Sequence, residues 1–208
     1  MKIEPVLLEN AWVRLEPCAP PLREELRAAL DVEPEVWAMM AGTGQGEHFE
    51  AWWRAALAQT AARTRAAYAV RRLADGALVG TTSLYDIRPE HRRCELGATF
   101  YRSEARGGAV NPSCKRLLLD HAFTSGAVRV EILTDALNAR SRAAIEKLGA
   151  RFEGVLGNHK IPWTGRVRDP ALYAVLDRDW PEVKAGLDAR LAAFLNAGRV
   201  IAGEADVR

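Results

Sequence analysis

The pattern of apolar and polar residues divides the chain into a helical first part and a strand-rich middle. Good helix formers fill PPLREELRAALDVEPEVWAMM, interrupted at Pro34, and GEHFEAWWRAALAQTAART, and a short strand around residues 12–16 precedes them. From Ala67 the pattern changes to the strand-like runs AYAVRRL, ALVGTTSLYDI and RRCELGATFY, and Asp75-Gly76 is a strong hairpin signal between the first two. We therefore predict an antiparallel meander in the middle of the chain.

The second half alternates between helical and strand patterns. It predicts a helix from about Asn111, a strand at AVRVEILTD, a helix from Asn138 to Leu148, strands near ARFEGVL and ALYAVL, and a final helix over residues 179–198. This order predicts an α+β fold with a mixed, mostly antiparallel central sheet of six to seven strands and helices on both faces. We find no internal repeat or linker, so we expect one domain over residues 1–208.

Composition narrows the classes of partner. The 29 basic and 27 acidic residues are mixed along the chain, without a long basic block, so nucleic acid is not the expected partner. No apolar run approaches the ~20 residues that span a bilayer, and we expect a cytoplasmic protein with no membrane partner. The three cysteines and four histidines are widely spaced, so we expect neither a disulfide framework nor a metal site.

The segment ARGGAVNPS places an arginine and two glycines directly before a predicted helix. Asn111 is expected to cap that helix and Pro112 to occupy its first position, where a missing N–H costs nothing. The free amides of residues 108–111 could then bind an anion, helped by the helix dipole and by the charge of Arg106. The alternative is that Gly107 and Gly108 only turn the chain after a strand.

A second helix start, in DALNARSRAAIEKLGARFEG, has similar chemistry. Asn138 is placed to cap the helix, Ser141 lies in its first turn, and Gly149 ends it. The simpler interpretation makes Asn138 only a cap and Ser141 only a first-turn residue.

Together these segments resemble the GNAT superfamily of acyl-CoA-dependent N-acetyltransferases. RGGAVN is similar to the family's Q/R-x-x-G-x-G/A pyrophosphate loop, and NARSRAAIEKLGARFEGV is similar to its asparagine-led helix and following strand. The order of E-x-G, N-x-R-S and E-K-L-G is closest to the branch of ribosomal-protein N-terminal acetyltransferases. The chain departs from the pattern at Ala109 and Asn111, where glycine is usual, and at Ile145, where many relatives have a tyrosine thought to protonate the leaving thiolate.

The resemblance implies direct attack of a primary amine on the thioester of acetyl-CoA. It implies Glu95 as general base, and the alternative for this residue is a structural carboxylate paired with an arginine. Strict alternation in CELGATFY would place Cys94, Leu96, Ala98 and Phe100 on one face of the strand and Glu95, Gly97, Thr99 and Tyr101 on the other. Ser141 is the candidate donor to the thiolate, or else a simple hydrogen-bond partner of the cofactor. The residues expected to bind acetyl-CoA are Thr99, Phe100, Tyr101, Arg106, Gly107, Gly108, Ala109, Val110, Asn111, Asn138, Ser141 and Lys147.

The acceptor is less well defined by the sequence. The residues expected to line the acceptor site are Trp37, Tyr85, His91 and Trp163. Tryptophans at helical spacing are, however, more often core residues. The segment GNHKIPWTGRVRDPALY could form a rim of the site or a homodimer contact. Three alternatives stay open: an acetyltransferase for protein or peptide N-termini, one for small amines such as amino acids, polyamines or antibiotics, and a non-catalytic CoA sensor, which Ile145 and the altered loop would suit.

Overall fold

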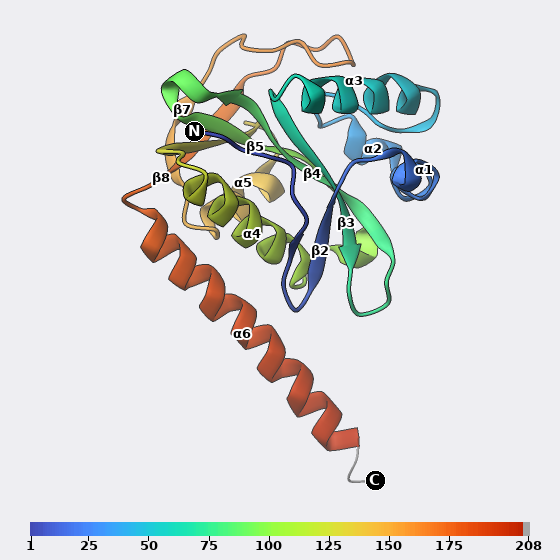
Figure 1. The fold of residues 1–208 in the computed structure, drawn as a ribbon, viewed down its shortest axis with the longest axis vertical. Helices are drawn as coiled ribbons and strands as arrows, with labels where there is room; N and C mark the ends of the chain where they lie inside the picture. Colours follow the sequence, from blue (N-terminus) through green and yellow to red (C-terminus); the bar gives the residue numbers. More distant parts are fainter. Residues whose placement is uncertain (206–208) are drawn as a thin grey trace.

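The computed structural model describes residues 1–205, which form an eight-stranded sheet with helices on both faces (Figure 1). The sheet order is β1-β2-β3-β4-β5-β6-β8-β7, and only β5 and β6 run parallel. The strands are β1 Leu8–Glu9, β2 Val13–Pro17, β3 Arg65–Arg72, β4 Leu78–Arg88, β5 Arg93–Tyr101, β6 Arg129–Asp135, β7 Arg151–Val155 and β8 Pro170–Leu176. The mixed, mostly antiparallel sheet is confirmed. The predicted count of six to seven strands was too low, because a strand of two residues such as β1 has no alternation to recognise.

Helices cover the sheet from both sides, as predicted. They are α1 Arg23–Leu30, α2 Pro34–Trp37, α3 Phe49–Ala61, α4 Val110–Thr124, α5 Ala139–Glu146 and α6 Trp180–Ala205. One buried cluster lies under α4 and includes Leu96 and Leu118, while a second lies under α1 to α3 and includes Trp37 and Phe100. The sheet therefore separates two cores, and residues of one strand reach either core according to the face on which they lie.

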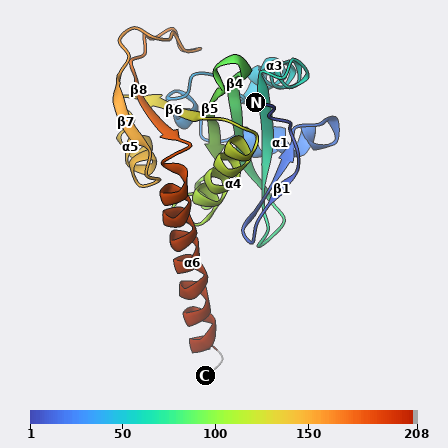
Figure 2. The ribbon, with the colours of Figure 1, turned by 60° about the vertical axis from the view of Figure 1, so that its left-hand side comes forward.

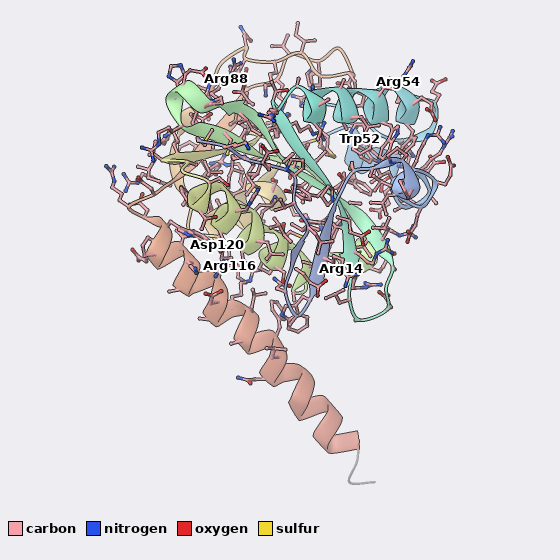
Figure 3. All side chains as sticks on the ribbon, viewed as in Figure 1. Arg14, Trp52, Arg54, Arg88, Arg116 and Asp120 are labelled. Atoms are coloured by element: carbon pink, nitrogen blue, oxygen red, sulfur yellow. The ribbon has the colours of Figure 1, made fainter. Side chains whose placement is uncertain are left out.

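The last helix is longer than predicted. It starts at Trp180, directly after the predicted cap Asp179, but runs to Ala205 and does not end near Gly198. A glycine inside a helix costs only about 1 kcal/mol relative to alanine, and no proline follows it to stop the helix. The first turns pack on α4, where Arg116 Nε donates to Asp188 and Lys184 Nζ donates to Asp120. Figure 3 labels Arg116 and Asp120, which lie on α4 beside α6. Beyond this contact α6 extends away from the sheet (Figure 2).

Among residues 1–205, no helix combines the length and the apolar character needed to cross a bilayer.

Candidate active site

Strand β5 carries a bulge at Ala98 and Thr99. Gly97 pairs with Ser83 and Phe100 pairs with Thr81. Ala98 and Thr99 therefore both lie opposite the single residue Thr82 of β4. Ala98 has φ 46°, and the extra residue reverses the alternation of side chains beyond it.

The bulge corrects the predicted faces of this strand. Phe100 packs in the α1–α3 core and Tyr101 in the α4 core, which is the opposite of strict alternation. The hydroxyls of Thr82 and Thr99 lie 2.8 Å apart, on the side of the sheet that α4 covers.

Beyond its first three residues, β5 separates from β6. The two strands pair only where Arg93–Glu95 meets Arg129–Glu131. In the described part of the chain, no other strand pairs with this edge of β5 from Leu96 to Tyr101. Backbone N–H and C=O groups on such an edge can bind an extended ligand as a further strand would.

The loop after β5 leads directly into the start of α4. The helix begins at Val110 with Ala109 as its N-cap, and the Ser113 amide donates to the Ala109 carbonyl at 3.0 Å. Asn111 is therefore not the cap, contrary to the prediction. Pro112 is the third helical residue, and it can lie there because the first four amides of a helix have no partner in the helix. These amides at the positive end of α4 suit an anion. A cavity of about 360 Å³ lies between this loop and the β1–β2 and β3–β4 turns, and its lining includes Trp12, Arg72 and Glu104 as well as Arg106 and Val110.

Arg106, which we predicted to add its charge to the anion site, is engaged within the protein. Its Nη1 lies 2.6 Å from Glu33 Oε2, its Nε donates to the Tyr101 carbonyl at 2.7 Å, and its guanidinium lies 5.7 Å from the centre of the Phe100 ring. These contacts tie the end of β5 to the turn before α2. The guanidinium charge is compensated by Glu33, so the loop amides are the stronger candidates for binding an anion here.

Glu95 and Tyr85 meet on the opposite face of the sheet from α4. Glu95 is 4% exposed, and the Tyr85 hydroxyl donates a hydrogen bond to its Oε1. Lys160 Nζ, from the loop between β7 and β8, lies 3.7 Å from Glu95 Oε2. Burial raises the pKa of Glu95, while Lys160 and the Tyr85 hydroxyl oppose that rise. Burial also raises the pKa of Tyr85, so the tyrosine is a neutral donor to the carboxylate.

The other predicted acceptor residues lie in different environments. Trp37 is 1% exposed and stacks on Phe100 with ring centroids 4.4 Å apart, so its indole belongs to the core. Trp163 is 44% exposed and its Nε1 donates to the Trp37 carbonyl, which ties the β7–β8 loop to the last residue of α2. His91 is exposed in the turn between β4 and β5, and within residues 1–205 no hydrogen bond or ion pair joins it to Tyr85 or Glu95.

A small cavity lies beside Tyr85, at the C-terminal end of β4. Its volume is about 290 Å³, and it is lined by Gln59, Thr64, Tyr85, Asp86, Ile87 and Arg88.

Helix α5 has the predicted cap. Asn138 Oδ1 accepts a hydrogen bond from the Ser141 amide at 2.9 Å, and Gly149 has φ 96° just beyond the helix. Ser141 is half-buried, Lys147 is exposed, and Ile145 is buried in the α4 core. The cap accounts for Asn138 structurally, and the cofactor roles of Asn138, Ser141 and Lys147 stay predictions.

Sequence analysis missed Lys115, a buried lysine beside the bulge. Its Nζ donates to Thr99 Oγ1 at 2.8 Å, and it forms no ion pair with a carboxylate in the described residues. Burial lowers its pKa to about 8. The sequence does indicate that this lysine is buried, because it shares one helical face with the apolar residues Leu118, Leu119 and Ala122.

Comparison with known proteins decides the family. A model of the acetyltransferase (GNAT) domain matches residues 13–151 of this chain. The chain belongs to the GNAT acetyltransferase family. GNAT enzymes use acetyl-CoA, and the free edge of β5 followed by the amides at the start of α4 fits an extended thioester arm that ends in a pyrophosphate.

Three relatives illustrate the similarity. The "Putative ribosomal N-acetyltransferase YdaF" of Bacillus subtilis is 29% identical over 109 residues, which cover 52% of this chain and 58% of that protein. A GCN5-related N-acetyltransferase from Brucella melitensis is 29% identical, with a TM-score of 0.83 over 92% of this chain and 87% of its own. RimJ of Mycobacterium smegmatis in complex with CoA-disulfide shares the fold at 20% identity, with a TM-score of 0.76 over 89% of this chain and 94% of RimJ. The match to YdaF agrees with the resemblance to the ribosomal-protein acetyltransferase branch.

Proposed function

We propose that this GNAT enzyme transfers acetyl from acetyl-CoA directly to the amine of a protein or peptide N-terminus. The observation that carries the proposal is the position of Glu95 on β5. Glu95 is the last residue of β5 that pairs with β6, so the free edge of the strand begins directly after it. A buried carboxylate and a strand edge suited to an acyl donor are thus neighbours on one element.

On the donor side, the edge from Leu96 to Tyr101 would bind the pantetheine arm through its amides. The amides of residues 107–111 would bind the pyrophosphate at the start of α4, and Arg106 would hold the end of β5 in place through the Tyr101 carbonyl. Asn138, Ser141 and Lys147 on and beside α5 would complete this side.

On the acceptor side, Glu95 would accept a proton from the attacking amine, directly or through water. Burial raises its pKa, which makes the carboxylate a stronger base than an exposed glutamate. As the amine nitrogen bonds to the carbonyl carbon, the C–S bond breaks and its electron pair leaves on sulfur. Ser141 could donate a hydrogen bond to that thiolate, and the Lys115 ammonium, held at Thr99, would add positive charge on the donor side.

A small-amine acceptor is the second candidate, and one observation favours it. The cavity beside Tyr85 measures about 290 Å³, which is the scale of a small ligand and not of a folded polypeptide surface. The match to YdaF favours the N-terminal acceptor instead, and membership of the family favours an enzyme over a CoA sensor.

The test is acetyl-CoA-dependent release of CoA thiol in the presence of two sets of amines. One set holds short peptides with free N-termini, with the same peptides carrying a blocked N-terminus as the matched control. The other set holds amino acids, polyamines and aminoglycosides. We expect release with the free peptides and background with the blocked ones. Release with small amines alone would replace the proposed acceptor with the second candidate, and release that neither set of amines raises above the amine-free background would contradict both.

A further inference from the structure

An amine of the protein itself already lies beside the candidate base. Lys160 Nζ is 3.7 Å from Glu95 Oε2, and the lysine side chain is 36% exposed. The backbone of Lys160 is fixed by an isolated bridge to Arg168, in which the Arg168 amide donates to the Lys160 carbonyl at 2.8 Å. The position of this amine is therefore set by the fold of the β7–β8 loop.

An acceptor amine must approach both Glu95 and the free edge of β5. The edge begins at Leu96, roughly 3.3 Å further along the strand. Lys160 meets the first requirement, and its flexible four-carbon stem lets the nitrogen move along the strand toward the second.

We propose that Lys160 is a site of self-acetylation. The inference rests on the proposed function, because it uses the same donor and the same base. The proton of the Lys160 ammonium passes to Glu95, the free nitrogen bonds to the acetyl carbon, and the C–S bond breaks with its electron pair leaving on sulfur. The second proton that the nitrogen loses as the amide forms protonates the CoA thiolate.

Acetylation of Lys160 would change the site in two ways. It removes the cation that opposes the burial of Glu95, so the pKa of that carboxyl rises further. It also places a neutral acetamide where an external amine would approach. The modified enzyme should therefore be less active toward external amines.

The other lysines provide an internal reference. The chain has five, Lys2, Lys115, Lys147, Lys160 and Lys184, and all of them lie within the described residues. Lys2 has a side chain that is 72% exposed, twice the exposure of Lys160, and its ion-pair partner is Glu4. Non-enzymatic acetylation by acetyl-CoA would favour Lys2, whereas acetylation directed by Glu95 would favour Lys160.

The experiment incubates the full chain with acetyl-CoA and no other amine, and follows the acetylation of each lysine by peptide mass spectrometry. We expect Lys160 to be modified at least about tenfold faster than Lys2, because a positioned base contributes that much or more. We also expect a rate constant that is independent of protein concentration, and loss of the preference in Glu95→Gln. Lys2→Arg is the matched control and should leave the rate at Lys160 unchanged.

Equal or faster modification of Lys2, or a rate at Lys160 unaffected by Glu95→Gln, would overturn the inference. The same preparation is assayed with external amines, which separates this inference from the function on which it rests. Transfer to an external amine without modification of Lys160 would overturn the self-acetylation alone. Absence of both reactions would overturn both proposals.

Discussion

The donor and acceptor sides of the candidate site are built from different parts of the polypeptide. The donor side is mostly backbone, formed by the free edge of β5 and the start of α4, and it is continuous from residue 96 to residue 112. The acceptor side consists of side chains from separate segments, with Tyr85 from β4, Glu95 from β5 and Lys160 from the loop after β7.

The difference explains which substitutions each side tolerates. Backbone amides do not depend on the side chain, so Ala109 and Asn111 can stand at positions where the family usually has glycine. The acceptor side depends on single ion pairs and hydrogen bonds around one buried carboxylate, so one substitution there changes its charge or pKa. Substitutions that alter only the backbone, or only one charge, test this contrast.

The largest effect on stability is expected from Gly80→Ala, because an added Cβ there would collide with the backbone beside the bulge. An alanine Cβ at this position would lie 2.0 Å from the Phe100 carbonyl oxygen, and backbone cannot move away as a flexible side chain can. We expect a loss of about 3 kcal/mol or more in the free energy of unfolding, measured by urea denaturation. Gly108→Ala is the control, because its Cβ would meet nothing within 4 Å. Equal stability of the two variants would show that β4 and β5 are not held as closely as we describe.

A second test removes the buried cation of the donor side with Lys115→Met. We expect the thiol of bound CoA to become about tenfold less acidic, since positive charge near the sulfur favours the thiolate. The measurement is a titration of thiolate absorbance in the protein–CoA complex, with S-methyl-CoA as the blank. Burial raises the pKa of Cys18 and of Cys94 to about 12 and that of Cys114 to about 11. The protein's own thiols therefore stay protonated near neutral pH and add no thiolate absorbance.

Lys184→Met is the matched control for that titration, because Lys184 pairs with Asp120 between α6 and α4. The positive charge of Lys115 is lost as the pH rises through about 8, so the difference from the wild type should be largest below that pH. Identical titrations of wild type and Lys115→Met would remove Lys115 from the donor side. The Cys114 thiol also acts on Lys115, and burial keeps that thiol neutral in this range.

A smaller effect is expected at the loop glycines. Gly107 has φ 78°, whereas Gly108 does not have a left-handed φ, and an added Cβ would contact nothing at either position. Alanine in the left-handed region costs about 1–2 kcal/mol. Gly107→Ala should therefore weaken acetyl-CoA binding, measured by calorimetry, while Gly108→Ala should leave it nearly unchanged. Equal acetyl-CoA affinities of the two variants would mean that the backbone path of this loop does not affect acetyl-CoA binding.

The smallest effect is expected from Tyr85→Phe, which should shift the pH dependence of the turnover rate. The tyrosine hydroxyl donates to Glu95 and lowers the pKa of that carboxyl, so its removal raises the pKa further. The base is active when deprotonated, and the acid limb of turnover should move to higher pH. If the acid limb of Tyr85→Phe stays at the wild-type pH, the hydrogen bond from Tyr85 does not set the pKa of Glu95.

Much of the fold could be predicted because seven of the strands are five or more residues long and carry an apolar or alternating pattern. The donor loop could be found because its parts are contiguous. The bulge could not be, since Ala98 and Thr99 look like any other pair in a strand and only their pairing with Thr82 reveals the extra residue. Every expectation about faces beyond Ala98 failed for that reason.

The acceptor side could be predicted only in part. Tyr85 and Glu95 were both named, but the contact between Glu95 and Lys160 joins residues far apart in the sequence, and no spacing predicts it. Arg106 was interpreted from the loop alone, and its compensation by Glu33 depends on the turn before α2. Side-chain pairs between distant segments are set by the tertiary fold, which local patterns do not encode.

The central claim is that Glu95 is the base for acetyl transfer at the edge of β5. The most direct test is the pH dependence of a single turnover, started by adding an acceptor amine to the preformed acetyl-CoA complex, in wild type and Glu95→Gln. We predict a rate lower by about 10²–10⁴-fold in the variant, with acetyl-CoA affinity unchanged, and loss of the acid limb that the wild type shows. A variant that keeps the same limb, or that transfers acetyl at the wild-type rate, would contradict the account.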